Sequence, residues 1–423
     1  MRLSLPRSRR SQLILGAVAL LTIAAVAVAG IVYRHDRTGS IYHPNARFVP
    51  QPAATLPNVA DELFSWPLYG YGANHSRFFP APVALHPPFR TVWQRDRGTL
   101  LEFPPVISGR HLFQLGDNAV LIATDTRTGD AYWIRHLGEL SASSPAVLGS
   151  TVWVTVLARN GRDHRGRIYA LNAATGAIRW ERDLSSPTES SPLIADGRVF
   201  FGSQSGLVYA LNAHTGAVIW TYQAPGAVKA SPSLSNGLLY FGDYSGHMQA
   251  ISETNGRRVW ISGSGGAVFG NGTFYSTAAV MYGRVFLGNT DGRVYAYDAF
   301  TGRLDWAVQT GAYVYASPAV TNAPGIGATV YEGSYDGTFR ALNARSGRVS
   351  WTFKAHGRIS GSATIIGDVV YFADLGTHTT YGLGISTGRV AFKIATGAFD
   401  PVISDGKWIY LTGVTGLFAL APA

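Results

Sequence analysis

Short apolar runs separated by glycine-containing turns recur along most of the chain. The clearest unit spans 170–180, where buried-type residues alternate before an Asn-Ala-Ala-Thr-Gly turn and a final Trp. Similar units occur at 123–133, 210–220, 250–260, 296–306 and 341–351, with a degraded copy at 382–392. The turn glycines are 40 to 47 residues apart. A regular period of this length predicts a repeat architecture.

Two further signatures accompany each unit. A Ser-Pro pair or a looser equivalent opens one apolar run, as at Ser191-Pro192, and an aromatic run such as 199–201 follows it. Each signature can be counted eight times, so every unit holds four short β segments rich in β-branched and aromatic residues. Four strands per repeat of about 40 residues are typical of a β-propeller blade. The pattern therefore predicts an all-β fold, an eight-bladed β-propeller with four-stranded blades.

The ends of the chain predict how the ring closes. The last unit, from 401 to 420, has three strands and then stops, whereas a strand of the Trp type at 91–94 has no blade of its own. Pairing the strand near Trp93 with the C-terminal unit completes the eighth blade and removes the open edges of the array.

The residues of the Thr-Gly unit can be explained by the requirements of a tight turn between two strands. Its Asn or Asp can bond the backbone two residues on, its Gly supplies a positive φ, and its Trp covers the seam to the next blade. The predicted structural residues are Gly129, Gly176, Gly216, Gly256, Gly302 and Gly347 with Trp133, Trp180, Trp220, Trp260, Trp306 and Trp351.

The N-terminal segment has a different character. Residues 1–12 are short and basic, 13–33 are almost entirely apolar, and 34–63 contain four prolines without apolar periodicity. The apolar run is long enough to span a bilayer, and the arginines before it favour a cytoplasmic N-terminus. We therefore predict a single-pass plasma-membrane anchor at 13–33, an extended stalk at 34–63 and an extracytoplasmic propeller at 64–423. Cleavage after a small-residue motif at 25–29, as in a signal peptide, is the alternative.

Composition narrows the function. The chain of 423 residues has no cysteine, which excludes disulfides and thiolate chemistry. Half of the net charge of +10 lies within the first 37 residues, so the propeller presents no basic patch of the kind that binds nucleic acid. We expect a monomeric propeller that binds no nucleic acid.

The repeated Ala-x-Asp/Asn-x-x-Thr-Gly-x-x-x-Trp motif resembles the pyrroloquinoline-quinone (PQQ) repeat. This unit builds quinoprotein alcohol dehydrogenases, and it is also found in the propeller lipoprotein of the outer-membrane β-barrel assembly machinery. The Trp66-Pro67-Leu68-Tyr69-Gly70 segment with Asn74 is similar to the lead-in of such propellers. The resemblance covers about 64–423 and implies the fold. It does not carry over the dehydrogenase activity, because that family holds its quinone beneath paired cysteines and beside Ca²⁺.

The mouth of the central channel is the first candidate site. One residue of each repeat, three positions before the Pro-type residue, is expected at the start of an innermost strand. Polar or aromatic members of this ring could bind a small polar ligand or a cation, although an internally neutralised, water-filled channel is the alternative. The candidate ring residues are Glu102, Glu189, Lys229, Tyr275 and Tyr315.

Two loops are candidate partner-binding elements. A basic loop lengthens one repeat, and a glycine-rich insertion at 263–275 carries two phenylalanines; ordinary solvent-exposed connections are the alternative for both. The residues concerned are Arg159, Arg162, His164, Arg165, Phe269 and Phe274. The histidines show no metal-ligand spacing, so we predict no metal site.

These observations favour a non-catalytic role. We expect a rigid extracytoplasmic scaffold that binds a protein or envelope polymer, without a cofactor. The alternative is a quinoprotein-type oxidoreductase that binds PQQ, a quinone or a metal such as Ca²⁺ in the central channel.

Overall fold

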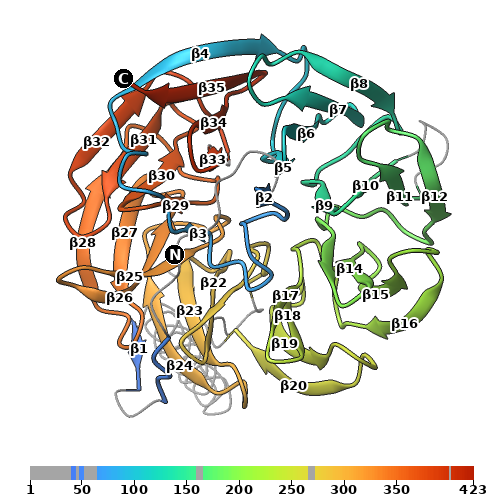
Figure 1. The fold of residues 1–423 in the computed structure, drawn as a ribbon. Coiled ribbons are helices and arrows are strands. Elements are labelled where there is room, and N and C mark those ends of the chain that lie inside the picture. The colour runs from blue at the N-terminus through green and yellow to red at the C-terminus, as the bar shows by residue number, and fades with distance from the viewer. Residues whose placement is uncertain (1–39, 44–46, 52–63, 159–164, 265–271, 400–401) are drawn as a thin grey trace, which may run out of the picture.

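A computed structural model describes residues 40–43, 47–51, 64–158, 165–264, 272–399 and 402–423. These residues form eight sheets arranged around a central channel, as Figure 1 shows, and the four blade strands of each sheet are antiparallel. Within the four strands of every blade, the strand nearest the channel is shorter than the outermost one. The prediction of an all-β, eight-bladed propeller with four-stranded blades is confirmed.

The blades follow one another along the chain. Blade 1 contains β5 (Val106–Ser108), β6 (His111–Leu115), β7 (Val120–Asp125) and β8 (Ala131–His136); blade 2 contains β9 (Ala146–Leu148), β10 (Thr151–Val156), β11 (Arg167–Asn172) and β12 (Ile178–Asp183). Blade 3 contains β13 (Leu193–Ala195), β14 (Arg198–Gly202), β15 (Leu207–Asn212) and β16 (Val218–Gln223); blade 4 contains β17 (Ser233–Ser235), β18 (Leu238–Gly242), β19 (His247–Ser252) and β20 (Arg258–Gly263).

The second half of the ring repeats the arrangement. Blade 5 contains β21 (Ala279–Met281), β22 (Arg284–Gly288), β23 (Arg293–Asp298) and β24 (Leu304–Gln309); blade 6 contains β25 (Ala319–Ala323), β26 (Gly327–Gly333), β27 (Thr338–Asn343) and β28 (Val349–Lys354). Blade 7 contains β29 (Thr364–Ile366), β30 (Val369–Ala373), β31 (Thr380–Gly384) and β32 (Val390–Ile394); blade 8 contains β33 (Val402–Ser404), β34 (Ile409–Thr412), β35 (Gly416–Pro422) and β4 (Phe89–Asp96).

Blade 8 closes the ring with strands from both ends of the propeller. Strand β4 pairs antiparallel with β35, and Trp93 lies opposite Ala419. The two strands run side by side in Figure 1, blue beside dark red. The predicted closure through the segment near Trp93 is therefore confirmed.

The Thr-Gly corners hold neighbouring blades together. At each predicted Gly the backbone has a positive φ, for example 68° at Gly176, where a Cβ would lie 2.7 Å from the ring of Trp133 in the preceding blade. The same indole donates a hydrogen bond of 3.0 Å to the carbonyl of Ala173. Equivalent indole bonds of 2.9–3.1 Å are made by Trp93, Trp180, Trp220, Trp260, Trp306 and Trp351. These contacts explain why the repeat requires Gly and Trp at this spacing.

The seam between blades 7 and 8 is built differently. Phe392 replaces the tryptophan, and its ring meets Phe89 edge-on with centroids 5.6 Å apart. This seam therefore has aromatic packing without an indole hydrogen bond to the next blade.

The Ser-Pro signature connects the blades around the channel. The Ser144 backbone amide donates to the Ser191 hydroxyl at 2.9 Å, and the Thr277 amide donates to the Ser317 hydroxyl at 3.0 Å. Because each hydroxyl satisfies a buried amide of the neighbouring blade, a small hydroxyl residue is favoured at this position.

Residues 64–79 cross the centre of the ring, and we call them the plug. The plug contains β2 (Ser65–Trp66), which pairs with β5, and β3 (Phe78–Phe79), which pairs with β29. Its carbonyl oxygens also accept backbone hydrogen bonds from innermost strands, among them Leu234 N to Ala73 O and Val320 N to Ser76 O. The plug thus satisfies channel-facing backbone groups that would otherwise be unpaired. The sequence did not reveal this role of the lead-in.

Parts of the predicted stalk contact the propeller. Strand β1 (Ile41–Tyr42) pairs with the outermost strand β24, and Phe48 stacks on Tyr282 with centroids 5.1 Å apart. This docking was not predicted. The predicted anchor at 13–33 lies outside the described residues, and within the described part of the chain no helix has the length and apolar character needed to cross a membrane.

Candidate functional site

The predicted ring residues lie in the loops that enter the innermost strands. Val228, Phe274 and Val314 are buried in the blades, and the residue after each of them lines the channel mouth. Phe274 packs against Gly242 at the end of β18, where an added Cβ would lie only 2.3 Å from the Phe274 side chain. This close contact fixes the position of Phe274. Because successive residues of an extended chain point in opposite directions, Lys229, Tyr275 and Tyr315 are directed into the channel.

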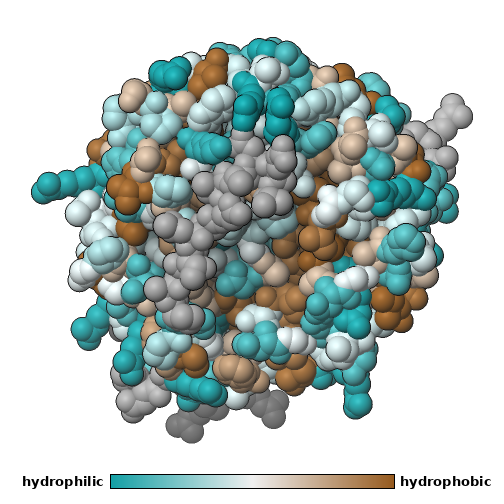
Figure 2. All heavy atoms as spheres, in the orientation of Figure 1, coloured by the Kyte–Doolittle hydropathy of each residue, from teal (hydrophilic) through white to brown (hydrophobic). Residues whose placement is uncertain are grey.

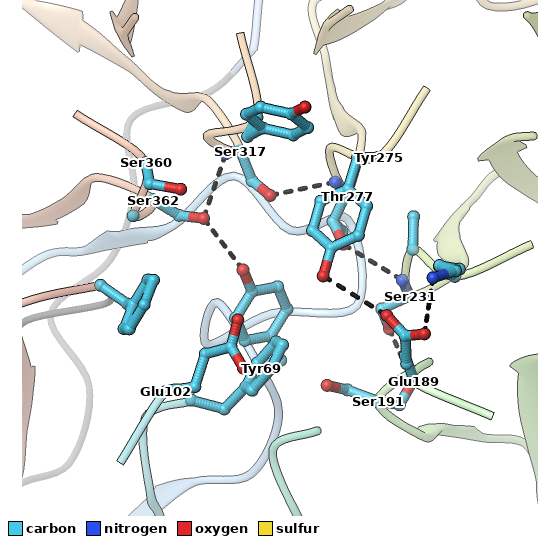
Figure 3. A pocket seen from close by; sticks show the side chains of 16 residues that line it. Tyr69, Glu102, Glu189, Ser191, Ser231, Tyr275, Thr277, Ser317, Ser360 and Ser362 are labelled. Carbon is cyan, nitrogen blue, oxygen red and sulfur yellow. Dashed lines mark hydrogen bonds and ion pairs between the residues drawn. The ribbon is translucent and has the colours of Figure 1, made fainter. Parts of the chain in front are cut away.

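These residues surround one cavity of about 60 Å³ at the channel mouth. Figure 3 shows side chains from several blades converging on it. All five predicted ring residues line it, and so does Ser360, which has the equivalent position in the repeat of blade 7. The equivalent alanines of blades 2 and 8, Ala142 and Ala398, do not line it. The structure therefore brings the predicted residues together, and ligand binding by them stays a prediction.

An ion pair dominates one side of the cavity. The Lys229 ammonium lies 2.7 Å from Glu189 Oε1, and the Gln204 side-chain amide donates to the same oxygen at 2.6 Å. The Tyr275 hydroxyl donates a long hydrogen bond of 3.5 Å to Glu189 Oε2. Glu189 is thus held in place by three neighbours.

Two of the lining residues, Tyr275 and Tyr315, are supported by further tyrosines behind them. Tyr275 contacts both Tyr244 and Tyr315, with centroids 6.1 and 5.7 Å apart, and Tyr315 contacts Tyr335 at 4.9 Å. Burial, followed by the charge of Glu189, raises the pKa of Tyr244 and Tyr275 well above the usual range. These hydroxyls therefore stay protonated at neutral pH and offer neutral hydrogen bonds, not a phenolate base.

The plug supplies the floor of the cavity. The Tyr69 hydroxyl shares a hydrogen bond of 2.9 Å with the Ser362 hydroxyl, as drawn in Figure 3. The guanidinium of Arg77 lies 3.9 Å from the centre of the Tyr69 ring, and His75 shares a hydrogen bond of 3.0 Å with Ser233. Three plug residues, Tyr71, His75 and Arg77, have positive φ values of 48° to 75°. The plug therefore maintains a conformation that costs energy and that the surrounding blades impose.

Sequence reasoning missed Tyr69, which lines the cavity, and Tyr244 and Tyr335, which pack behind the lining tyrosines. They lie outside the repeat position that defined the ring, because they come from the plug and from turns between the two middle strands of a blade. The available signal was the aromatic residue directly before or within the Ser-Gly and Asp-Gly turns, as in Tyr244-Ser245-Gly246 and Tyr335-Asp336-Gly337.

The two predicted partner loops have different outcomes. Arg159, Arg162, His164 and Phe269 lie outside the described residues, and Arg165 is exposed. The prediction of an exposed Phe274 is wrong: the residue is 0% exposed and packs edge-on against Tyr295 with centroids 5.7 Å apart. Phe274 has the blade-anchoring position that valine occupies in neighbouring repeats, so it cannot serve as a surface contact.

The cavity does not fit PQQ with Ca²⁺. Its volume of about 60 Å³ is small beside the roughly 300–1,000 Å³ of a typical cofactor site. Calcium takes six to eight oxygen ligands, and among the described residues no group of three or more His, Asp or Glu side chains could hold a metal. Lys229 also occupies the Glu189 carboxylate that a cation would need.

Figure 2 shows a mixed surface around the channel in the orientation of Figure 1. Apolar residues, coloured brown, gather near the centre of this face, and hydrophilic residues dominate much of the rim. Several outer strands also expose apolar side chains, such as Ile178, Val218 and Val349, each about half exposed. The molecule therefore offers this face and its outer edges for contacts.

Solved structures share this architecture. BamB from Moraxella catarrhalis matches 79% of this chain and 100% of its own chain with a TM-score of 0.65 and 18% identity. A europium-containing methanol dehydrogenase matches 85% of this chain and 98% of its own with a TM-score of 0.71 and 14% identity. At these identities the likeness concerns the fold alone.

Sequence comparison is more specific. The outer membrane protein assembly factor BamB of Yersinia pestis is 30% identical over 133 residues, which are 28% of this chain and 32% of that protein. The chain thus matches about a third of the length of this curated relative. The family profile described as outer membrane protein assembly factor BamB matches residues 164–270 and 246–407, which together are more than half of the chain. With its PQQ-type repeats and closed eight-bladed ring, the chain belongs to this family.

Proposed function

We propose that this protein is a non-catalytic propeller that binds a protein partner during assembly of the cell envelope. The observation that carries this proposal is the family match over more than half of the chain. The name of that family refers to outer-membrane protein assembly, and the propeller here has the same repeat architecture.

The geometry of the channel supports a binding role. The plug fills the ring, the tyrosines remain protonated, and the cavity is small, so the described residues offer no acid–base pair set around a substrate-sized space. A rigid ring with loops on both faces is suited to recognition by preformed surfaces, because little ordering entropy is lost on binding.

We also propose that residues 13–33 anchor the chain in the plasma membrane, with the propeller outside the cytoplasm. The support is the apolar run and the arginines that precede it. An extracytoplasmic propeller would face the same compartment as an envelope partner.

Affinity purification tests the binding role. The full chain with a C-terminal tag is crosslinked in its native membrane, solubilised and purified, with a tagged version lacking residues 64–423 as the control. We expect specific envelope proteins to be enriched with the full chain only. Recovery of no protein above the control would contradict the proposal.

The oxidoreductase alternative has its own test. The full chain is titrated with PQQ and Ca²⁺ while thermal unfolding and dye reduction with alcohols are followed. We expect no shift in unfolding temperature and no dye reduction. A clear shift accompanied by turnover would favour the dehydrogenase alternative.

A further inference from the structure

We propose that the outer corners of blades 4 to 7 form a basic surface that contacts anionic phospholipid headgroups of the membrane in which the chain is anchored. This inference rests on the anchor proposed above and adds which part of the propeller meets the lipid and through which chemistry. It depends on a charge asymmetry within the repeat, on a cavity at one corner and on the docked N-terminal segment.

The residue directly after the turn glycine differs between the two sides of the ring. In blades 4, 5, 6 and 7 it is an exposed arginine, whereas in blades 1, 2 and 3 it is aspartate or alanine. The arginines are Arg257, Arg303, Arg348 and Arg389, and blade 6 adds the exposed Arg345 in the same turn. Because equivalent turns of a propeller lie on the same rim, these five residues form one basic arc.

The acidic residues near the basic arc are buried. Glu253, Asp298 and Asp305 are 6%, 4% and 0% exposed. Asp298 accepts hydrogen bonds from backbone amides of its own turn, and Asp305 lies 2.9 Å from the buried Arg284 and 3.3 Å from Arg303. Arg303 is thus the one member of the arc with an acidic partner among the described residues.

Arginines near other corners are used differently. Arg135 donates hydrogen bonds to the carbonyls of the blade 2 turn, and Arg182 donates to the carbonyl of Gly216 in the blade 3 turn. By contrast, the guanidinium groups of Arg345 and Arg348 donate no hydrogen bond to any residue that the structure describes. Their donors remain available for an external anion.

The docked N-terminal segment adds charge at the centre of the arc. The guanidinium of Arg47 lies 4.7 Å from the centre of the Phe300 ring in the blade 5 turn, and that of Arg345 lies 5.9 Å from the Phe48 ring. Aromatic contacts of this kind position a guanidinium without neutralising it. The segment therefore orders part of the basic surface and keeps its charge.

A cavity of about 480 Å³ lies at the blade 6 corner of the arc. It is lined by residues of the docked segment, of β24 and of the blade 6 turn, namely Tyr42, His43, Trp306, Arg345, Ser346 and Arg348. None of these described lining residues is acidic. Guanidinium groups bind phosphate in a bidentate manner, and Tyr and Trp rings are favoured at the membrane–water interface. The cavity therefore suits the phosphate of one phospholipid headgroup.

The proposed anchor holds this side of the ring close to the bilayer. Six residues separate Ser40, beside β24, from the end of the apolar run at Tyr33. Even when fully extended, that length of chain spans about 25 Å. Blades 4 and 6 flank blade 5, whereas blades 1 and 2 lie across the ring, as Figure 1 shows. An extended basic arc beside the anchor matches a membrane surface better than a compact acidic protein.

The sequence did not reveal this surface. The four arginines that follow the turn glycines are 41 to 46 residues apart, and the ring brings them to one rim. They therefore form no run of basic residues along the chain.

A single fluorophore measures how close the basic arc lies to lipid. The natural chain has no cysteine, so Ser346→Cys in blade 6 and Thr175→Cys at the equivalent position of blade 2 each accept one label. Each labelled full chain is reconstituted in nanodiscs of phosphatidylcholine alone, or of phosphatidylcholine and phosphatidylglycerol in equal amounts. A lipid with a nitroxide headgroup is the quencher in both.

We expect the label at 346 to be quenched about fivefold more strongly in the anionic discs, because one arginine beside an anionic surface shifts contact by about that factor. The label at 175 should be quenched weakly in both kinds of disc. Equal quenching of the label at 346 in both discs, or stronger quenching of the label at 175, would overturn the inference.

Matched charge removal localises the contact. Arg345→Gln with Arg348→Gln should reduce quenching of the label at 346 in anionic discs to its level in phosphatidylcholine discs. Arg179→Gln with Arg182→Gln removes two charges from blade 2 across the ring and should leave quenching unchanged. Thermal unfolding checks each fold, and Arg348→Gln alone, at an exposed position, repeats the test with a smaller change. Unchanged quenching in a folded Arg348→Gln protein would contradict the assignment.

Two further measurements separate the alternatives. Inorganic phosphate and chloride at equal ionic strength should reduce the quenching equally, through screening alone; a much stronger effect of phosphate would indicate a site for free phosphate and overturn the lipid assignment. A photocrosslinker at 346 should capture lipid in native membranes. Capture of a protein in place of lipid would assign the arc to a protein partner and overturn the inference.

Alkaline extraction of membranes tests the anchor independently. A chain that alkali retains, with equal quenching in the two kinds of disc, would leave the anchor intact and contradict the basic surface. A chain that alkali releases but that still prefers anionic discs would contradict the anchor and support the basic surface. Release together with no preference would contradict both.

Discussion

The outer corners of the blades and the mouth of the channel belong to the same repeat but differ in how much variation they allow. At the outer corners a Gly and a Trp recur in contact, as with Gly176 and Trp133. At the channel mouth the equivalent position holds Glu102, Ala142, Glu189, Lys229, Tyr275, Tyr315, Ser360 or Ala398. The corners are occupied by backbone and indole at close range, whereas the mouth opens on a cavity. Repetition therefore marks where blades must fit together, and the positions at the mouth vary because no such fit constrains them.

Removing a corner tryptophan should have the largest effect. Trp133→Ala is expected to lower the free energy of unfolding by about 3–5 kcal/mol, because a large buried ring leaves a cavity at the seam. Trp133→Phe keeps an aromatic ring and loses the hydrogen bond to Ala173, so about 1 kcal/mol is expected. Denaturant unfolding of both variants measures the difference. Equal losses would show that the indole ring does not hold the seam.

His75 in the plug should make the free energy of unfolding depend on pH, whereas the Gly and Trp residues at the outer corners do not titrate. Burial and the charge of Arg77 lower the pKa of His75 to about 3, from 6.5 in the unfolded chain. As pH falls, His75 takes up its proton in the unfolded chain before it does so in the folded protein. The stability that the folded protein gains from neutral His75 is therefore fully present above about pH 6.5 and is lost progressively toward pH 3. The slope approaches about 1.4 kcal/mol per pH unit.

Unfolding measured between pH 7 and pH 4.5 tests this contribution. Between pH 7 and pH 4.5 the free energy of unfolding should fall less in His75→Gln than in the natural protein. The difference between the two falls should be about 2 kcal/mol. His214→Gln, which removes an exposed histidine at an outer corner, should keep the natural slope. A parallel pH dependence in the natural protein and His75→Gln would show that His75 is not the group responsible.

Substituting a corner glycine should have an intermediate effect. Gly216 has a φ of 69°, and a Cβ there would lie 2.6 Å from the Trp180 ring. Gly237 has a φ of 73°, and a Cβ added to Gly237 would meet no atom within 4 Å. Gly237→Ala should cost about 1 kcal/mol for the backbone alone, and Gly216→Ala about 2–3 kcal/mol. Thermal unfolding of the pair isolates the contact with tryptophan; equal costs would contradict its importance.

Changing the channel mouth should have the smallest effect on stability. Glu102→Gln alters a partly exposed side chain at the cavity, and we expect the free energy of unfolding to change by no more than about 0.5 kcal/mol. Denaturant unfolding under the conditions used for Trp133→Ala makes the comparison direct. A loss similar to that of a corner variant would show that the mouth residues serve the fold and not recognition.

Most of the fold could be predicted from the sequence because the chain is a repeat. Most features of the fold follow from local requirements that can be recognised in the sequence. Examples are the positive φ that requires Gly at a turn, the Trp that follows it, and the strand near Trp93 that needs a partner. The same period identified the ring positions, including Glu189 and Lys229, because equivalent residues of a closed repeat must surround its axis. The exposed role predicted for Phe274 is wrong because the residue directly before a channel-facing position, here Tyr275, points into the blade.

The sequence by itself determined the number of blades, their closure and the set of residues that could reach the channel, because these follow from period and local backbone chemistry. Only the tertiary structure decided that residues 64–79 fill the channel, that Tyr69 becomes the floor of a cavity and that Lys229 pairs with Glu189. The physical reason is distance along the chain. Such contacts join residues far apart in sequence that meet only when eight blades have closed around the plug.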